Sequence, residues 1–353
     1  MKRYSVVVVG AGWRGRGHIE AFQANSDRFD LRAVCDRDVG RMEDTLSEIN
    51  VSVPIYADAE EMLAQEKPDV FCFATQPDMR LELIRAGIRH GVRAIAYEKP
   101  MATSLAEAKR ICDECDRAGV KQIICHQHKY GAHWRKVKEI IDSGAIGTVR
   151  RVHATSKGWF LHYMTHLVDY AMWLLDYPEV TWVTGQVHGR SKLSDNHPSA
   201  DYVLGQVAFA SGVRAFFECG ALAPSRGVKD RFWYDAGATV YGTEGFAEVT
   251  VGGGWRAVTR NQSQPIGDPS ISLDETVDTI PYIADLAAWL DDDNREHPCC
   301  GRLAYRGFQV AMGMLVSALD RRTVTLPVDV SVPVTERLLH ELPMDPFIGE
   351  FVI

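Results

Sequence analysis

The segment Ser5–His18, with the sequence SVVVVGAGWRGRGH, constrains the fold of this chain more than any other. Its four valines, Val6–Val9, predict a strand buried on both faces of a parallel sheet. The strand runs directly into a GxGxxG pattern formed by Gly10, Gly12 and Gly15, and a helical pattern follows. Such a turn lets backbone approach a pyrophosphate, and the helix N-terminus offers it N–H groups. We therefore predict a dinucleotide-binding turn, the alternative being a glycine-rich turn that binds nothing.

Length and charge limit the remaining possibilities. A chain of 353 residues exceeds what one hydrophobic core usually serves, so we expect two domains. The net charge of −8, without a basic block, argues against nucleic acid as a partner. The sequence has neither an apolar run of membrane-spanning length nor a signal-peptide pattern. We expect a cytoplasmic protein without a membrane partner.

The order of patterns along the chain predicts an α/β fold. Up to about residue 126, short apolar runs alternate with helical patterns, as in a doubly wound parallel sheet. Between residues 180 and 257 the segments lengthen and alternate, as in a large, open, mainly antiparallel sheet. We expect a dinucleotide-binding Rossmann domain over residues 1–124 and a second domain over residues 125–353.

Details of the second half are expected as follows. Two late helices are predicted, at Tyr282–Asp292 and Ala304–Leu319, followed by an extended tail rich in valine and proline. The polar segments 191–200 and 261–270 have the composition of mobile loops.

Polar residues follow several predicted parallel strands. Asp36 lies 21 residues beyond Gly15, close to the spacing of the carboxylate that binds the adenosine ribose, and it favours NAD over NADP. The adjacent Arg37 leaves NADP possible, because a guanidinium can pair with a 2′-phosphate. Thr75 and Pro77 follow another strand and complete this predicted cofactor edge.

Lys99 follows Glu98 at the end of a further strand and is the first candidate catalytic residue. A partly desolvated lysine beside a cationic nicotinamide should have a lowered pKa. It could then bind a substrate hydroxyl and help to move its proton. The alternative is a surface lysine that pairs with Glu98.

Two histidines four residues apart, His162 and His166, share one face of a predicted helix. His166 is a candidate general base, because imidazole titrates near neutral pH. The alternatives are capping, core packing and a metal site. A metal is not expected, because the HxxxH pattern lacks a following glutamate and a third ligand. The CxxC formed by Cys112 and Cys115 also lacks a second pair.

Several motifs together resemble one known family. They are the N-terminal GxGxxG, Glu98-Lys99-Pro100, the polar helix start before WLLD, IIDSGAIGTVRRVHA and GRLAYRGFQVAMGMLVSALDRRTVTLPV. They resemble the glucose–fructose oxidoreductase/inositol dehydrogenase (Gfo/Idh/MocA) family over nearly the whole chain. The resemblance implies a Rossmann domain and a second domain that binds substrate and forms oligomers. The open sheet commonly mediates dimers or tetramers, so it implies a homodimer or homotetramer.

The resemblance also implies roles for individual residues. Lys99 would be catalytic, and His166 and Asp169 match two positions of the family's Asp-x-Gly-x-His-x-x-Asp pattern. His162 stands where that pattern has aspartate and is a further catalytic candidate. Arg80 stands near a position where histidine is common. The implied cofactor-binding residues are Gly10, Gly12, Trp13, Arg14, Gly15, Asp36, Arg37, Thr75, Pro77, Glu98 and Lys99. The implied substrate-binding residues are Gln127, His128, Lys129, Trp159 and Tyr163, with Trp233 as a further stacking surface.

Three functions remain open from the sequence. The first is an NAD(P)-dependent oxidoreductase that acts on a secondary hydroxyl of a sugar, cyclitol or sugar derivative. The second is a glycoside hydrolase or lyase that keeps NAD bound, oxidises the sugar transiently, eliminates a substituent and returns the hydride. The third is a non-catalytic sensor of a sugar or a dinucleotide.

Overall fold

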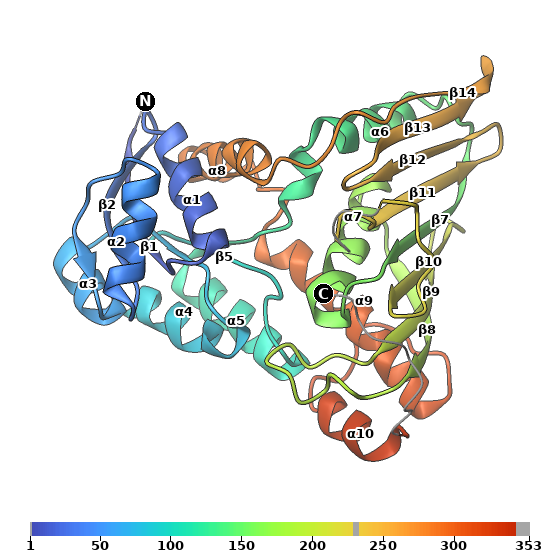
Figure 1. Cartoon of the computed structure of the whole chain (residues 1–353). Helices are drawn as coiled ribbons and strands as arrows, with labels where there is room; N and C mark the ends of the chain where they lie inside the picture. The colour runs from blue at the N-terminus through green and yellow to red at the C-terminus, as the bar shows by residue number, and fades with distance from the viewer. Residues whose placement is uncertain (1, 229–232, 344–353) are drawn as a thin grey trace. The chain divides into compact units, whose positions relative to one another are not determined.

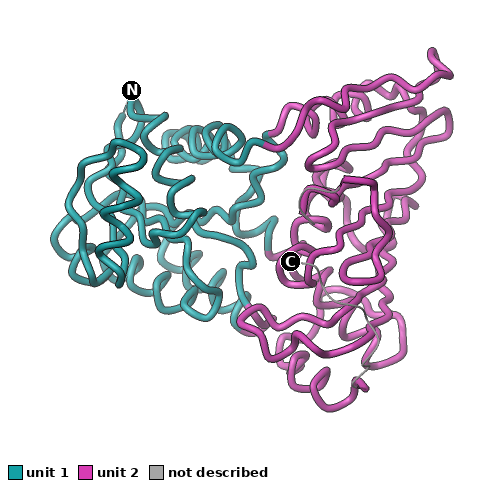
Figure 2. The backbone as a smooth tube through the Cα atoms, viewed as in Figure 1, with its two compact units in different colours: residues 1–102, 107–130, 274–304 teal, residues 103–106, 131–273, 305–353 magenta. Residues whose placement is uncertain are grey.

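A computed structural model describes residues 2–228 and 233–343 of the chain. The chain forms two compact units (Figure 2). The first contains residues 1–102, 107–130 and 274–304, and the second contains residues 103–106, 131–273 and 305–353. Neither unit is contiguous in sequence, whereas we expected a single boundary at residue 124.

The first unit is built on a six-stranded sheet in which every neighbouring pair is parallel. Its strands are β1 (Tyr4–Val9), β2 (Phe29–Cys35), β3 (Ile55–Tyr56), β4 (Val70–Phe73), β5 (Ala94–Tyr97) and β6 (Lys121–Ile124), in the order β3-β2-β1-β4-β5-β6. The central strand β1 is paired on both sides, and Val6, Val7 and Val8 are fully buried. The predicted doubly wound parallel sheet is therefore confirmed.

Helices connect these strands (Figure 1). They are α1 (Trp13–Ala24), α2 (Val39–Glu48), α3 (Ala59–Glu66), the short η1 (Pro77–Met79), α4 (Arg80–Arg89), α5 (Leu105–Ala118) and the short η2 (Gln127–Tyr130). Every parallel strand therefore ends at the same edge of the sheet, where the loops that carry the predicted cofactor residues begin.

A late helix returns to the first unit and explains its discontinuity. Helix α8 (Glu275–Asp291) buries an apolar face in the same core as α1. The Asn25 amide at the end of α1 donates a 3.0 Å hydrogen bond to the backbone oxygen of Ile280. The Tyr4 hydroxyl donates a 2.7 Å hydrogen bond to Asp291. Residues 274–304 therefore belong to the first unit because α8 covers part of its core.

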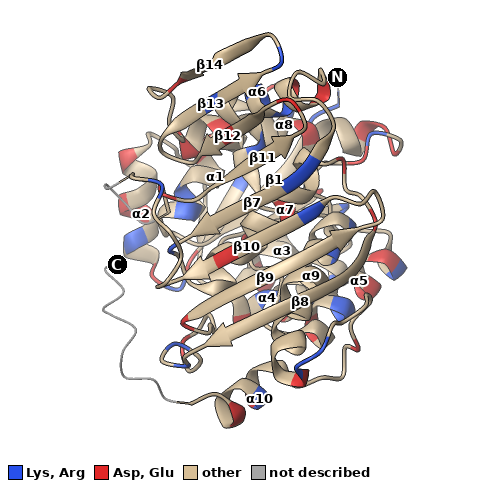
Figure 3. Ribbon diagram, turned by 90° about the vertical axis from the view of Figure 1, so that its right-hand side faces the viewer, with Lys and Arg blue, Asp and Glu red and all other residues tan. Residues whose placement is uncertain are grey.

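The second unit contains an eight-stranded, mainly antiparallel sheet, as predicted (Figure 3). Its strands are β7 (Val149–Ser156), β8 (Val180–His188), β9 (Tyr202–Phe209), β10 (Arg214–Gly220), β11 (Gly237–Gly242), β12 (Phe246–Thr250), β13 (Gly254–Thr259) and β14 (Gln262–Asp268), in the order β14-β13-β12-β11-β7-β10-β9-β8. Among the described strands of this second sheet, only the β7–β10 pair is parallel. Its helices are α6 (Ala132–Asp142), the π-helical turn η3 (Phe160–Met164), α7 (Thr165–Leu174), α9 (Gly301–Asp320) and α10 (Val334–Glu341).

The structure corrects two expectations for the second unit. The polar segment 261–270, expected to be a mobile loop, contains the edge strand β14, which pairs with β13. The tail, expected to be extended, forms α10, which buries Val334 and Leu338. In the described ranges 2–228 and 233–343, the helices lack the combination of length and apolar character needed to cross a membrane.

A buried histidine in the first unit makes folding dependent on pH. The ring of His297 is 1% exposed, and burial lowers its pKa to about 4. Its Nδ1 accepts a hydrogen bond from the Cys299 N–H, and its Nε2 lies 2.9 Å from the Tyr282 carbonyl oxygen. Both contacts are satisfied only by the neutral ring with hydrogen on Nε2.

We expect acid to destabilise the chain through His297. An unfolded histidine takes up a proton near pH 6.5, whereas the folded one does so only near pH 4, so stability falls as the pH decreases through that interval. The contribution of His297 reaches about 3 kcal/mol at the acid end. Urea unfolding from pH 7 to 4 should show a shallower decline for His297→Asn than for the unaltered chain. The exposed His340→Asn serves as the control, and parallel pH curves for all three proteins would contradict this assignment.

Candidate functional site

The glycine turn between β1 and α1 has the shape that a dinucleotide phosphate requires. Gly10 has a φ of +110°, and a Cβ on Gly15 would lie 1.9 Å from the Gly10 carbonyl oxygen. Gly12 begins α1 without a side-chain cap, and no acidic residue lies in the first turn of the helix. Neither the N-cap residue nor an acidic residue of the first turn therefore competes with a ligand at this end of α1. These features fit an anionic pyrophosphate.

Asp36, at the end of β2, lies against this turn. One carboxylate oxygen accepts a 2.6 Å hydrogen bond from the Ala11 N–H, and the other accepts a 2.9 Å bond from the Asp38 N–H. Arg37 is exposed beside it. Arg41, which the sequence analysis missed, places its guanidinium 3.5 Å from the position of a Cβ on Gly12. The edge thus holds both a carboxylate suited to ribose hydroxyls and guanidinium groups suited to phosphate.

We expect Asp36→Ala to weaken NAD binding more than NADP binding. Removing the carboxylate costs NAD a charge-assisted hydrogen bond, about tenfold in Kd, whereas for NADP it also removes a repulsion from the 2′-phosphate. Fluorescence titration with each dinucleotide measures the two ratios. The exposed Asp27→Ala is the matched control. Equal losses of affinity for both dinucleotides would remove Asp36 from the ribose site.

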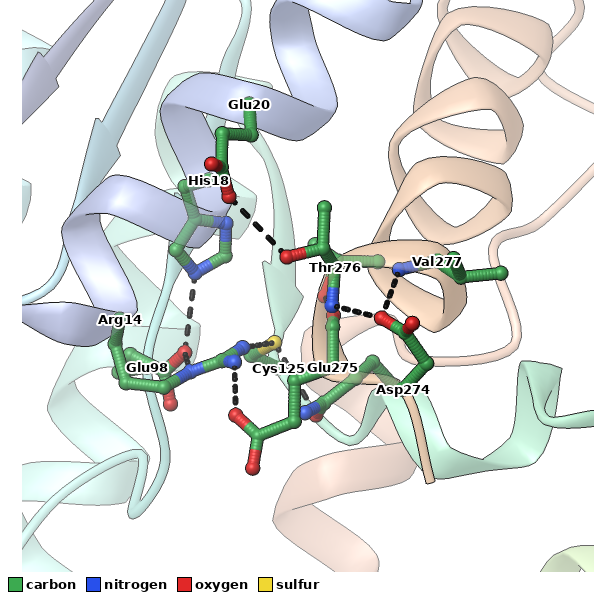
Figure 4. Close-up of polar contacts among 11 residues, drawn as sticks. Arg14, His18, Glu20, Glu98, Cys125, Asp274, Glu275, Thr276 and Val277 are labelled. Carbon is green, nitrogen blue, oxygen red and sulfur yellow. Dashed lines mark hydrogen bonds and ion pairs between the residues drawn. The ribbon is translucent and has the colours of Figure 1, made fainter. Parts of the chain in front are cut away.

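A buried ion-pair network connects α1, β5 and α8 (Figure 4). The Arg14 guanidinium donates through Nε to Glu98 at 2.8 Å, through Nη1 to Glu275 at 2.7 Å, and through Nη2 to the Cys125 sulfur at 3.3 Å. His18 Nε2 lies 3.1 Å from the same Glu98 oxygen. Glu98, directly before Lys99, is therefore held by two residues of the helix that follows the glycine turn.

Electrostatics keep this network charged. Burial alone would raise the pKa of Glu98, but the charge of Arg14 and the hydrogen bond from His18 hold it well below its usual range. Burial lowers the pKa of Lys99, although the Glu98 carboxylate opposes the shift. The predicted direction of the Lys99 shift is thus confirmed, and a lysine with a lowered pKa can exchange a proton more readily at neutral pH.

Three of these residues could also be read as metal ligands. His18, Glu98 and Cys125 each offer one ligand atom, and these atoms lie within 4.8 Å of one another. However, Arg14 donates hydrogen bonds to both Glu98 and Cys125. Burial also raises the pKa of the Cys125 thiol well above its ordinary value. The cluster therefore fits an arginine-centred ion-pair network better than a metal site.

Arg80 joins the loop after β4 to the loop after β5. Its buried guanidinium donates to the Thr75 carbonyl oxygen at 2.8 Å, to the Thr75 hydroxyl at 3.0 Å and to the Pro100 carbonyl oxygen at 3.4 Å. Burial lowers the pKa of Arg80 to about 10. Thr75 and Pro77 follow β4, and Arg80 ties this loop to the backbone beside Lys99.

The substrate candidates Gln127, His128 and Lys129 form η2 after β6 and are buried. The Lys129 ammonium donates a 2.6 Å hydrogen bond to the Pro298 carbonyl oxygen. The Cys125 thiol lies 3.4 Å from the Gln127 side-chain oxygen. The contacts of Lys129 and Gln127 therefore tie η2 to its own unit, and contact of these three residues with substrate stays a prediction.

The second unit carries the histidine candidates. His162 lies in the π-helical turn η3, and His166 lies in the first turn of α7. His166 is 3% exposed, and its Nδ1 lies 2.7 Å from the Tyr170 hydroxyl. The Tyr170 hydroxyl at Nδ1 fixes the orientation of the His166 ring.

Aromatic candidates surround these histidines. Tyr163 is buried, and its hydroxyl donates a 3.0 Å hydrogen bond to the Trp233 carbonyl oxygen. The half-buried Trp159 packs edge-on against the His162 ring, with centroids 5.3 Å apart. Trp159 therefore borders His162, whereas the Tyr163 hydroxyl is engaged by the backbone.

Besides Arg41, the sequence analysis missed Glu275 and Tyr170 and did not anticipate the contacts of Arg80. Glu275 lies 261 positions from Arg14, and the buried destination of Arg80 has no local signal. Tyr170 did have one, because it follows His166 at the same four-residue spacing by which His162 precedes it.

Comparisons with known proteins agree with this geometry. Residues 4–126 match the GFO/IDH/MocA family model, described as an oxidoreductase family with an NAD-binding Rossmann fold. Residues 134–248 match the model of the GFO/IDH/MocA C-terminal domain. The two models follow one another along the chain and together cover most of it.

Among curated relatives, a D-apiose dehydrogenase from Paraburkholderia graminis is 30% identical over 148 residues, which are 42% of this chain and 39% of that protein. An inositol 2-dehydrogenase from Burkholderia lata is 26% identical over 259 residues, which are 69% of this chain and 72% of that protein. The match to the first relative thus spans less than half of its length.

A solved structure shows the same fold. The levoglucosan dehydrogenase complex with NADH and levoglucosan superposes with a TM-score of 0.78, covering 93% of this chain and 100% of that chain at 15% identity.

Proposed function

The chain belongs to the GFO/IDH/MocA oxidoreductase family, and from this premise we propose that it oxidises a secondary hydroxyl group of a sugar, a cyclitol or a sugar derivative with NAD. One observation carries the proposal. The helix that leaves the glycine turn holds Glu98 through Arg14 and His18, and Glu98 adjoins a lysine with a lowered pKa. The named activities of the D-apiose and inositol dehydrogenases support the substrate class.

In this proposal some residues bind the cofactor and others handle the hydroxyl proton. When bound, NAD supplies the hydride acceptor. Gly10, Gly12 and Gly15 leave room for its pyrophosphate, and Asp36 accepts hydrogen bonds from the adenosine ribose. Lys99 binds the oxygen of the reacting hydroxyl and, in its neutral form, accepts the hydroxyl proton; the lowered pKa makes that neutral form more available.

His166 is the second proton-handling residue in this proposal. Tyr170 holds its ring through Nδ1, so Nε2 either donates a hydrogen bond to the substrate oxygen or accepts the hydroxyl proton. We assign the hydroxyl proton to Lys99 because the ammonium pKa is lowered by burial, and we assign orientation of the hydroxyl to His166.

A substrate panel tests this function. Sugars, cyclitols and glycosides are incubated with the chain and NAD, and NADH absorbance and released products are followed in the same samples. We expect NADH to accumulate in proportion to an oxidised sugar or cyclitol. Product release without net NADH would replace the proposal with the recycled-cofactor hydrolase or lyase. A chain that binds NAD but reduces it with no compound would favour the non-catalytic sensor.

We also propose that two copies meet through the outer face of the eight-stranded sheet, as a homodimer or within a homotetramer. Helices α6 and α7 pack against this sheet, whose strands carry few charges in Figure 3. Half-buried Phe216 contacts Arg151, and Trp182 contacts Arg214, at 5.5 and 5.3 Å from ring centre to guanidinium. Aromatic and arginine side chains are the types enriched in protein interfaces. Light scattering of the purified chain measures the number of copies.

A further inference from the structure

A loop in the second unit is fixed against the turn that carries His162. At its base, the buried carboxylate of Asp201 accepts hydrogen bonds from the Ser191 N–H at 3.0 Å and from the Ser191 hydroxyl at 2.7 Å. Near the end of the segment, the Ser199 hydroxyl accepts a 3.1 Å hydrogen bond from the Leu161 N–H of η3. The segment 191–200, expected from its composition to be a mobile loop, is thus attached at both places.

This attachment stacks aromatic and basic side chains. The His197 ring lies on the His162 ring, with centroids 3.9 Å apart and an interplanar angle of 26°. The Lys192 ammonium lies 4.7 Å from the centre of the Trp159 ring, which itself packs against His162. Two imidazoles and one ammonium therefore gather around one indole. We call His162, Lys192 and His197 the basic patch.

Polar side chains of the same loop contact Ser191 and His197. Asp201 binds Ser191, as described, and Asp195 accepts a 3.1 Å hydrogen bond from the backbone N–H of His197. The Asn196 side-chain oxygen lies 2.9 Å from His197 Nδ1, so hydrogen on Nδ1 satisfies that contact. The basic patch brings three basic side chains together in a chain whose net charge is −8.

The charge and hydrogen-bond donors of the basic patch indicate which kind of ligand it binds best. A neutral imidazole offers one N–H donor, and the Lys192 ammonium offers three N–H donors and a positive charge. An anionic oxygen group accepts charge-assisted hydrogen bonds from the ammonium, which are about twice as strong as those between neutral groups. The patch is therefore suited to an anion more than to an uncharged sugar.

We propose that the basic patch binds an anionic group, a carboxylate or a phosphate ester, carried by the substrate. His162 precedes His166 by four residues, so this group would bind next to the reacting hydroxyl. The chain accordingly acts on sugar acids or sugar phosphates in preference to their neutral parents. This inference rests on the proposed function for its reaction, but its binding step can be measured separately.

The first experiment compares matched substrates. The values of kcat/KM are measured with NAD for D-glucuronate, glucose 6-phosphate and D-glucose, and for D-galacturonate and D-galactose. We expect the charged member of a pair to exceed its neutral parent. In Lys192→Met and His197→Gln that ratio should fall about tenfold, the effect of losing one charge-assisted hydrogen bond. The half-buried Lys136→Met, in the same unit, is the control for loss of a positive charge and should retain the ratio.

The second experiment needs no turnover. Histidine side chains of the full chain are labelled with ¹³C, the resonances of His162 and His197 are assigned with His162→Gln and His197→Gln, and glucuronate, inorganic phosphate and glucose are titrated in. We expect shifts with the two anions, smaller shifts with glucose, and weaker anion binding in Lys192→Met. Resonances that respond to neither anion, or neutral sugars turned over as well as their acids, would overturn the inference. Anion-dependent shifts without any NAD reduction would uphold the binding site and reject the proposed function.

Discussion

Lys99→Met is expected to lower kcat/KM by about a thousandfold, the size of effect seen when a positioned acid or base is removed. Binding of NAD should stay within a few-fold, because the glycine turn and Asp36 are untouched. The reason is local. Lys99 follows Glu98, whose carboxylate is fixed by Arg14 and His18, so methionine removes the proton-exchanging group and leaves its surroundings.

Two further variants make this result specific. Lys99→Arg keeps the positive charge but cannot give up its proton at neutral pH, so it should remain nearly inactive. The exposed Lys67→Met, in the same unit, should behave like the unaltered chain. Dehydrogenase assays and dinucleotide titrations measure both quantities. Full activity in Lys99→Met would refute the assigned role, and full activity in Lys99→Arg would reduce that role to charge alone.

Arg14→Met is expected to be the most destabilising substitution in the first unit, lowering its free energy of unfolding by about 3–5 kcal/mol. The substitution leaves the Glu98 carboxylate, 6% exposed, without the guanidinium that bonds it at 2.8 Å. It also removes the 2.7 Å bond to Glu275, which joins α8 to α1. A buried carboxylate without its partner either stays charged, at a cost in desolvation free energy, or takes up a proton.

Helix α1 itself supplies the control for Arg14. Arg16, two residues further along, pairs with Glu20 and Glu48 at the surface, so Arg16→Met should change stability by less than about 1 kcal/mol. Adding Glu98→Gln to Arg14→Met should restore part of the loss, because a neutral amide needs no counter-charge. Urea unfolding of the four proteins measures these differences. Equal stabilities for Arg14→Met and Arg16→Met would show that the network does not hold the unit together.

The sequence was most informative where contacts are local. Val6–Val9 is apolar without interruption because both faces of β1 are buried, and that run predicted a buried strand of a parallel sheet. Asp36, Thr75 and Lys99 follow strands, and parallel strands end at one sheet edge, so their shared location could be predicted without coordinates.

Contacts between distant segments could not be predicted in this way. An amphipathic pattern indicates that α8 is a helix but does not say which core it covers. Glu275 meets Arg14 across 261 positions of sequence. The segment Gln262–Asp268 is mostly exposed, so it lacks the alternation that identifies a half-buried strand, and its pairing with β13 depends on its neighbour. For the same reason the two carboxylates that contact the Arg14 guanidinium could not be anticipated, and the assignment of Arg14 to the cofactor stays a prediction.

At the candidate site, too, local features could be predicted and contacts between distant segments could not. The spacing of His166 from His162 made it a candidate, and its role stays a prediction, whereas the lowered pKa of Lys99 was anticipated from burial at a strand end. The stacking of His197 on His162 depends on two residues that fix the loop 191–200. Asp201 follows the loop and binds Ser191, and Ser199 near the end of the loop binds Leu161. No pattern within residues 191–200 indicates which side chains that loop will meet.

Deuterium transfer tests the central claim, that this chain moves hydride from a carbinol carbon to NAD. The best substrate of the panel is prepared with deuterium on the carbon that bears the reacting hydroxyl and is incubated with the chain and NAD. The account requires one deuterium at C4 of the nicotinamide, found by mass spectrometry and NMR, and none with Lys99→Met. Product that forms while the nicotinamide stays unlabelled would contradict it.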